Sequence, residues 1–302
     1  MFFRVAAIIV FWALLIGCGG KKSLSQEDII SSPNTKGALD KKLNVFDENP
    51  EQPHFIVAGV ADKNAPNKTL LEEWGGKKNP SAKERLDRQA IQALLESTSV
   101  IDTTPYQLTD DLKNALLNSK NLKWLNIGDN ATSSDLEWIT EISGLRGLGL
   151  NGADLGNADL NLLSRLKDLE WIDLSYASLP NDVGEGLPEM PKLEVLWLRG
   201  IANADQFAPK TNQFPQLSVL CLGYTNLSDS GVNQIAASNP RLMFLDLFDT
   251  EVTPISIDGF VKFRDLRFLH LGQTPLQLQL GRSKGVDDFR GRMPKCDIKF
   301  GS

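Results

Sequence analysis

A pattern of apolar positions, Leu-x-x-Leu-x-Leu with occasional isoleucine, occurs seven times between residues 122 and 271. The first positions of successive copies are 23, 24, 24, 24, 25 and 24 residues apart. The last two apolar positions alternate with polar or variable ones, which is the period of a short strand with one buried face. So regular a period predicts a solenoid with one strand and one return segment per turn. The copies begin at Leu122, Leu145, Leu169, Leu193, Leu217, Leu242 and Leu266.

The segments between the copies favour helices of different quality. Residues 135–142, 159–166 and 228–235 place apolar side chains at helical spacing, and the third of these begins with residues that cap helix N-termini. Residues 186–191 and 207–209 contain prolines, which predict short or irregular helices there. The pattern therefore predicts an α/β solenoid whose leucines stack into a single core.

The region before the repeats has signals of its own. Ser81 and Glu84 have the spacing of a capping box that opens a helix. Residues 99–101 favour a strand, and residues 109–117 favour a second helix. We expect residues 54–120 to be an N-terminal cap with a degenerate repeat that shields the first core leucines, as solenoids require. A separate small domain over these residues is the alternative.

The repeat array resembles the leucine-rich repeat family. The later repeats are similar to its bacterial form, in which a threonine replaces the asparagine that follows the strand. Residues 286–298 look like the closing segment of such proteins. The resemblance implies a horseshoe arc of about seven strand–helix repeats over residues 121–278 with a C-terminal cap over 279–302. It does not imply a function, since the family includes inhibitors, receptors, adhesins and ligase adaptors. The threonines are Thr225, Thr250 and Thr274.

The early repeats depart from the family pattern after the strand. That position is asparagine in the first repeat and alanine or isoleucine in the next three. The resemblance implies a ladder of side-chain hydrogen bonds at this position, so we expect the ladder to be partly missing in the early repeats. The four residues are Asn130, Ala153, Ala177 and Ile201.

The start of the chain has the features of an export signal. Residues 1–4 form a short basic segment, and residues 5–17 form an apolar stretch that is too short for a typical membrane-spanning helix. The sequence Leu-Ile-Gly-Cys at 15–18 resembles the lipobox of bacterial lipoproteins. The resemblance implies that residues 1–17 are a signal peptide and that Cys18 is acylated, with chains such as palmitate. An uncleaved anchor or a short core helix is the alternative.

The same resemblance implies a location in the bacterial cell envelope. An aspartate after the lipidated cysteine commonly retains lipoproteins at the inner membrane, and this chain has Gly19 there. We therefore expect the outer membrane, at its periplasmic face or at the cell surface. Residues 18–53 are polar and sparse in large apolar residues, which predicts a flexible tether that spans on the order of 30 Å.

Composition limits the classes of partner and chemistry. The formal net charge is −6, which disfavours binding to nucleic acid through bulk charge. The only histidines are His54 and His270, so we expect no histidine-rich metal site and no cofactor. Cys221 and Cys296 are expected to stay unbridged, because two or more strands about 4.8 Å apart should separate them.

Two patterns resemble catalytic or nucleotide sites without their structural context. Residues 147–152 match Gly-x-Gly-x-x-Gly, but their leucines belong to a repeat strand rather than to a strand-to-helix turn. Cys221, Asp246 and His270 occupy one column in successive repeats, so the acid should lie between the thiol and the imidazole. That order is wrong for activating a nucleophile, although an Asp246–His270 pair is plausible.

Residues that flank the core leucines should face the concave side of the solenoid. They form a surface rich in aromatic residues with a few charges, and Trp, Tyr and Arg dominate interface energetics. Exposed aromatic clusters are uncommon without a function, which favours binding; the alternative is that the rings pack across neighbouring strands and stabilise the sheet. The candidate contact residues are Trp124, Trp171, Asp173, Tyr176, Trp197, Arg199, Tyr224, Phe244, Asp246, Phe248, Phe268 and His270.

The sequence therefore predicts a lipid-anchored envelope protein, not an enzyme, whose concave face binds a protein or peptide of unknown identity. It predicts membrane attachment through Cys18 and no binding of nucleic acid. The alternatives are a structural scaffold with no ligand on the concave face, a glycan binder, or an enzyme with its chemistry in residues 54–120. The last alternative is weak because the ionisable residues of that region form no recognisable catalytic set, namely His54, Asp102, Asp110 and Asp111.

Overall fold

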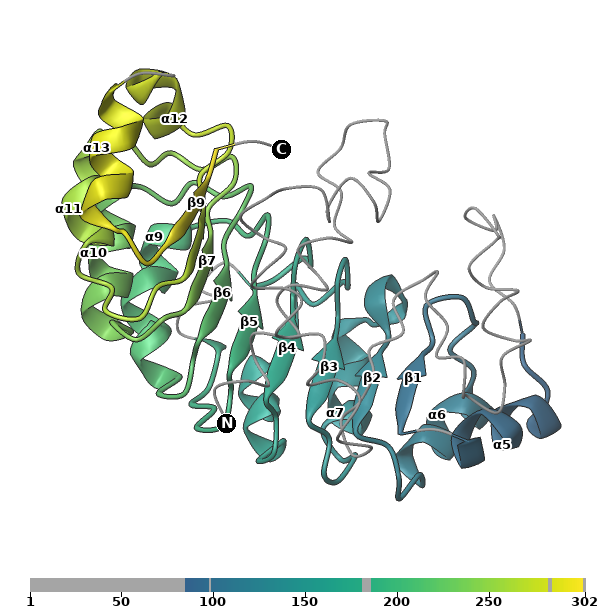
Figure 1. Cartoon of the computed structure of the whole chain (residues 1–302). Coiled ribbons are helices and arrows are strands. Elements are labelled where there is room, and N and C mark those ends of the chain that lie inside the picture. The colour runs from purple at the N-terminus through teal and green to yellow at the C-terminus, as the bar shows by residue number, and fades with distance from the viewer. Residues whose placement is uncertain (1–84, 98, 181–185, 282–283, 301–302) are drawn as a thin grey trace. The chain divides into compact units, whose positions relative to one another are not determined.

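The computed structural model describes residues 85–97, 99–180, 186–281 and 284–300. Within them, nine strands form one parallel sheet, and each strand pairs with its neighbours in sequence order. Each turn of the chain thus adds one strand beside the previous one, and the return segments lie together on one side of the sheet (Figure 1). The sheet does not close, so the fold is the predicted leucine-rich repeat solenoid, an open arc.

The strands are three residues long and follow the predicted repeats. The strand expected near residues 99–101 is present as β1, while β9 at the other end of the sheet was not predicted. β9 pairs with β8 and extends the sheet beyond the last repeat. The bounds are β1 Val100–Asp102, β2 Trp124–Asn126, β3 Gly147–Gly149, β4 Trp171–Asp173, β5 Val195–Trp197, β6 Val219–Cys221, β7 Phe244–Asp246, β8 Phe268–His270 and β9 Asp297–Lys299.

The core is a stack of aliphatic side chains, one set per turn. The middle residue of each strand points into this core and stands in register with its counterparts, as Leu196, Leu220 and Leu245 do. All three are fully buried. Burying one leucine side chain stabilises the fold by about 2 kcal/mol. Because strand side chains alternate, the first and third residues of each strand point to the opposite side, which we call the inner face.

The return segments differ between the two halves of the solenoid. Toward the N-terminus they are 3-10 turns and one short helix, and residues 159–166 form a 3-10 helix rather than an α-helix. The longest return helix is α10, where the hydroxyl of Ser228 caps the N-terminus by accepting from the backbone N–H of Ser230. The segments are η1 Gly128–Asn130, η2 Ser133–Asp135, α7 Leu136–Ile139, η3 Leu160–Arg165, α9 Ala204–Phe207, η4 Ala208–Gln213, α10 Asp229–Ser238, η5 Pro254–Ser256, α11 Ile257–Phe260 and α12 Pro275–Leu280.

Helices accompany both ends of the sheet. α5 (Arg88–Ser97) and α6 (Asp110–Leu117) flank β1 in the chain, and the predicted helix at 109–117 is confirmed with Thr109 as its N-cap. At the other end, α13 (Lys284–Arg292) precedes β9. Among the described residues, no helix is long and apolar enough to cross a membrane. The proposed signal peptide, lipidation site, tether and capping box, at 1–17, Cys18, 18–53 and 81–84, lie outside the described residues.

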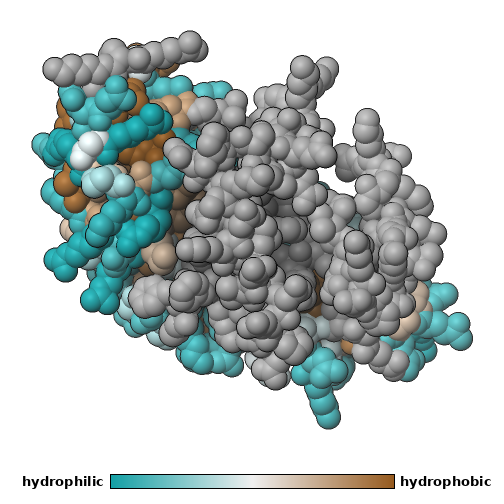
Figure 2. Space-filling view, in the orientation of Figure 1, coloured by the Kyte–Doolittle hydropathy of each residue, from teal (hydrophilic) through white to brown (hydrophobic). Residues whose placement is uncertain are grey.

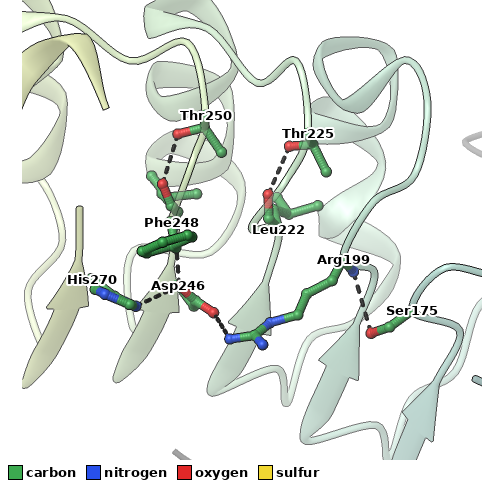
Figure 3. A network of polar contacts seen from close by, with 9 residues as sticks. Ser175, Arg199, Leu222, Thr225, Asp246, Phe248, Thr250 and His270 are labelled. Atoms are coloured by element: carbon green, nitrogen blue, oxygen red, sulfur yellow. Dashed lines mark hydrogen bonds and ion pairs between the residues drawn. The ribbon is translucent and has the colours of Figure 1, made fainter. Parts of the chain in front are cut away.

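The residue four positions after the end of a repeat strand makes different hydrogen bonds in different repeats. Asn130 donates to backbone carbonyls of the preceding turn, among them that of Thr103 at 2.9 Å. The hydroxyls of Thr225 and Thr250 instead donate to carbonyls three residues back in their own turn, at 2.7 and 2.8 Å (Figure 3). These threonines therefore close their own turns and do not link one repeat to the next.

Candidate binding surface

Tryptophan side chains interlock on the inner face of the N-terminal half. The ring centroids of Trp124 and Trp171 are 6.3 Å apart, and those of Trp171 and Trp197 are 6.1 Å apart. Trp171 and Trp197 lie on the adjacent strands β4 and β5, whereas Trp124 on β2 reaches Trp171 across β3. The three side chains are 3%, 3% and 4% exposed. The expectation that they form an exposed aromatic face is wrong, and their ring contacts explain part of the burial.

Gly147 explains how the first of these contacts forms. A Cβ at this position would overlap the ring of Trp124, so the missing side chain leaves the space through which that ring reaches Trp171. Gly149 leaves similar space for the side chain of Asn126. The glycines at 147 and 149 are therefore strand residues that receive neighbouring side chains. The resemblance of this segment to a nucleotide-binding loop has no structural basis, as predicted.

Charged side chains gather on the inner face of the C-terminal half. Asp246, at the end of β7, accepts from the Arg199 guanidinium and from Nδ1 of His270 at 3.0 Å (Figure 3). The backbone N–H of Phe248 donates to the same carboxylate at 3.1 Å. Asp246 is 1% exposed, so it is held by a full set of donors rather than by water. The predicted Asp246–His270 pair is confirmed.

Arg199 reaches Asp246 across an intervening strand, a contact that the sequence analysis missed. Arg199 follows β5 and Asp246 ends β7, with Gly223 occupying the equivalent position after β6. Gly223 has no side chain, and a Cβ there would lie 3.5 Å from Oδ2 of Asp246, the oxygen that accepts from Arg199. A glycine between an arginine and an acid in neighbouring columns is the signal that could have revealed the pair.

Burial and neighbouring charges act in opposite directions on the pKa values of Asp246 and Arg199. Burial alone would raise the pKa of Asp246, but the hydrogen bond from His270 and the charge of Arg199 outweigh burial and lower it. Burial would likewise lower the pKa of Arg199, but the charge of Asp246 raises it above its ordinary range. Asp246 and Arg199 therefore form a stable buried ion pair. The Nε of Arg199 is also buried and has no hydrogen-bond partner among the described residues.

Asp173, at the end of β4, lies in a different environment. Burial raises its pKa to about 6, although donation from Ser175 and the charge of Arg199 act in the opposite direction. The backbone N–H of Ser175 donates to its carboxylate at 2.8 Å. Ser175 also accepts from the backbone N–H of Arg199 at 3.3 Å, which connects this acid to the cluster. Asp173 thus takes up a proton in a pH range where Asp246 stays ionised.

Cys221 lies next to Asp246 in the sheet, and Asp246 lies next to His270, so the acid separates thiol and imidazole as predicted. Burial and the nearby carboxylate raise the pKa of the Cys221 thiol well above its ordinary value. A thiol must lose its proton to act as a nucleophile, so this cysteine is inert. Cys296 precedes β9, and β7 and β8 separate that strand from β6. Both cysteines are free.

The predicted contact residues divide into buried and accessible groups. Phe244 and Phe248 are buried like the tryptophans, and Phe244 stacks on Phe268 with centroids 4.6 Å apart. The expectation of exposed rings is therefore wrong for both. Tyr176 is 51% exposed, and the remaining accessible members of the set are partly exposed. Those partly exposed residues are Tyr224, Phe268 and His270.

Some exposed apolar side chains belong to the return segments rather than to the inner face. Ile255 in η5 and Leu278 in α12 are 74% and 77% exposed. Figure 2 shows mostly hydrophilic residues on the coloured surface, with hydrophobic ones gathered at the C-terminal end of the solenoid. The sequence analysis did not single out these residues, because single exposed apolar side chains carry no periodic signal.

Comparisons with known proteins find solved structures that share low sequence identity with this chain. No protein-family model and no curated protein matches the chain. Similar solved structures include a leucine-rich repeat protein of Leptospira interrogans, with 24% identity, a TM-score of 0.48 and coverage of 72% of this chain and 52% of that one. An internalin of Listeria monocytogenes has 17% identity, a TM-score of 0.43 and coverage of 72% of both chains. TLR13 in complex with ssRNA13 has 19% identity, a TM-score of 0.45 and coverage of 71% and 34%.

This chain thus spans about half the length of the Leptospira protein and about a third of TLR13. At such identities the likeness concerns the fold alone. What any of these proteins binds is a property of that protein and is not transferred to this chain.

Proposed function

We propose that this chain is a lipid-anchored binding protein of the bacterial cell envelope that holds a protein or peptide partner. The partner lies against the inner face from β5 to β8 and the turns that follow β4 to β7. The observation that carries the proposal is the group of accessible rings, Tyr176, Tyr224 and Phe268, around a fixed ion cluster. Aromatic residues and arginine are the residue types that dominate protein interfaces.

The ion cluster gives this surface its specificity. Asp246 holds both Arg199 and His270 in place before any ligand arrives, which lowers the entropy lost on binding. His270 is partly exposed and stacks near Phe248 at 5.1 Å, so its ring borders the accessible surface. A partner therefore meets rigid rings and oriented polar groups, as in preorganised interfaces.

Binding explains this chemistry better than catalysis does. The one thiol in the cluster, that of Cys221, is kept protonated by burial. Within the described residues, no group of three or more acidic, histidine or cysteine side chains could hold a metal ion. Of the acids considered in the N-terminal cap, Asp102 accepts from Thr104 at 2.8 Å and Asp111 pairs with Arg88 at 3.5 Å on the surface. These are local structural contacts.

Photo-crosslinking in intact cells tests the binding surface. A benzophenone amino acid replaces Tyr224 in one variant and Leu278 in the other, both accessible positions on opposite sides of the repeats. We expect discrete adducts after irradiation from position 224 and none from position 278. Absence of adducts from 224 in a folded variant, or equal adducts from both, would favour a structural scaffold instead.

Lipid anchoring is a separate part of the proposal, supported by the resemblance of residues 15–18 to a lipobox. Cells that express the full chain are grown with radiolabelled palmitate, and the protein is recovered from membranes. We expect the label in the wild-type chain and its loss in Cys18→Ser. Equal labelling of the two chains would refute this part and leave the binding surface untouched.

A further inference from the structure

The turns after the strands place a defined column of residues at the edge of the sheet. Backbone N–H groups of this column donate to the next turn, as Tyr176 does to Arg199 at 2.7 Å and Tyr224 does to Phe248 at 2.7 Å. Its members from the second repeat onward have positive φ, between 53° and 73°. We call this set the turn column; it comprises Asp129, Gly152, Tyr176, Gly200, Tyr224, Asp249 and Gln273.

Tyrosine is an unusual residue for the backbone of the turn column. Left-handed φ favours glycine and is disfavoured for bulky side chains. The chain uses glycine at 152 and 200 but tyrosine at 176 and 224, where φ is 56° and 59°. A strained conformation of this kind persists where the surrounding structure enforces it, and it is common at functional sites. The alternation also has a steric use, because a Cβ at Gly200 would overlap the ring of Tyr176.

The space above Gly200 lets the two tyrosines meet. Their ring centroids are 6.1 Å apart, and the ring of Tyr224 continues to Phe248 at 5.1 Å. Tyr176 is the most exposed aromatic ring of the set, at 51%. The result is a row of rings that runs across successive turns and ends in solvent.

The charges beside this row have one sign. Asp154, Asp249 and Glu251 are exposed and form no ion pair within the described residues. Asp249 follows Tyr224 in the turn column, about 5 Å along the solenoid. The seven turns contain a single basic residue, Arg199, and it is buried against Asp246. The seven turns are 127–132, 150–155, 174–179, 198–203, 222–227, 247–252 and 271–276.

The opposite edge of the sheet, where the chain enters the strands, differs both in its number of basic residues and in the pairing of its acids. It contains many lysines and arginines, and neighbouring repeats neutralise some of them. Arg146 donates to Glu170 at 2.5 Å, and Lys192 donates to Asp168 at 2.6 Å. Glu170 and Asp168 are therefore paired at this edge, whereas Asp154, Asp249 and Glu251 are accessible at the other, next to the tyrosines.

We infer that the turn edge is a docking surface for a segment of the partner that carries lysine or arginine. The cationic group lies over the ring of Tyr176 or Tyr224 and is attracted by its π face. Asp154, Asp249 and Glu251 supply the opposite charge, and they repel the phosphates of a nucleic acid. This inference rests on the proposed function and names the chemistry of the partner.

A random heptapeptide library, displayed on phage and selected on the purified full chain, tests the inference. We expect enriched peptides to carry lysine or arginine. The strongest is synthesised with a counterpart in which glutamine replaces each basic residue, and affinities are measured by calorimetry. We expect the counterpart to bind about tenfold more weakly.

Variants of the chain locate the bound peptide. Tyr176→Gly relieves the positive φ yet removes the ring, and Asp249→Asn with Glu251→Gln removes two charges. We expect each to weaken binding about tenfold. Two controls should bind within about twofold of wild type: Tyr176→Phe, which keeps the ring, and Asp287→Asn with Asp288→Asn, an equal loss of exposed charge on α13.

Other outcomes overturn the inference. Enrichment of neutral or acidic peptides, tighter binding of an oligouridylate than of any peptide, or equal losses in the turn variants and the α13 control would each refute a cationic segment at the turns. The proposed function would survive if a selected peptide still lost affinity on Phe268→Ala. No enrichment at all would refute both.

Discussion

The two halves of the inner face use the same repeated backbone in different ways. In the N-terminal half, Trp124 and Trp171 interlock over Gly147, and the contacts are between rings. In the C-terminal half, Arg199 and Asp246 form a buried ion pair that crosses a strand. A repeat fixes where a side chain points, and the side chain then decides whether that position packs the sheet or presents polar groups. Four sets of substitutions test this difference between packing and charge pairing, and their expected effects on stability decrease from about 4 to about 1 kcal/mol.

Removing the carboxylate of Asp246, the central acid of the C-terminal half, should destabilise the fold most. Asp246→Ala leaves the buried guanidinium of Arg199 without a counter-charge, which should lower the free energy of unfolding by about 4 kcal/mol. Urea denaturation measures the loss. Asp249→Ala, three residues on and exposed, is the matched control and should change stability little. Similar losses in the two variants would show that the ion pair has no special role.

The pH dependence of stability separates Asp173 from Asp246. Because the pKa of Asp173 is raised to about 6 from 3.8, the folded chain keeps a proton that the unfolded chain releases between these values. The free energy of unfolding should therefore fall as pH rises from about 4 to about 6, by about 3 kcal/mol from this group. Asp246 has the opposite sign, since its pKa is lowered and its contribution is lost only as pH falls below 3.8.

Asp173→Asn should remove this residue's share of the fall between pH 4 and 6 and leave both the acid loss below it and the share of Asp102, whose pKa burial also raises. Its amide oxygen can still accept from the N–H of Ser175. Urea denaturation at a series of pH values compares the two chains. Parallel profiles for wild type and variant over this window would contradict the account of Asp173.

Adding one methyl group tests the packing of the N-terminal half. Gly147→Ala places a Cβ inside the space of the Trp124 ring, which should lower the free energy of unfolding by about 2 kcal/mol. Gly223→Ala is the matched change in the C-terminal half, where the new Cβ would lie 3.2 Å from the carbonyl oxygen of Phe248 and 3.5 Å from Oδ2 of Asp246, with no overlap like that at 147. We expect a smaller loss there by thermal unfolding. The reverse order would contradict the proposed interlocking.

The smallest expected effect concerns the threonines. Thr250→Val removes the hydroxyl that donates to the Leu247 carbonyl at 2.8 Å inside the turn, and it should cost about 1 kcal/mol. Because the bond lies within one turn, the cost should not depend on the neighbouring repeat. A double-mutant cycle with Thr225→Val should therefore be additive, and coupling above about 0.5 kcal/mol would indicate a ladder between repeats.

Much of the fold could be predicted because a period of about 24 residues fixes it. The period placed Leu196 and Leu220 in the core and Asp246 beside His270 in one column. Each of those positions depends only on the register of the strand. β9 was missed because it begins 29 residues after β8 (Phe268 to Asp297), outside the period, and Lys295 replaces the first leucine of the pattern.

Side-chain burial was harder to predict than position. The pattern places Trp171 on the inner face, but its burial depends on rings from other turns, as well as on the glycine at 147 that admits one of them. The Arg199–Asp246 pair joins residues that are 47 positions apart and occupy different columns of the repeat. A comparison of residues within one column therefore does not reveal it. The positive φ of Tyr176 is not predicted by its residue type.

Hydrogen exchange on the full chain tests most directly whether recognition belongs to the C-terminal turns and inner face. The selected heptapeptide is added, and amide protection is compared with that of the free chain. We predict added protection at residues 174–179, 222–227 and 247–252 and in β8, and unchanged exchange in α10 and α12. Protection confined to the return helices, or to β2 and β3, would contradict the account.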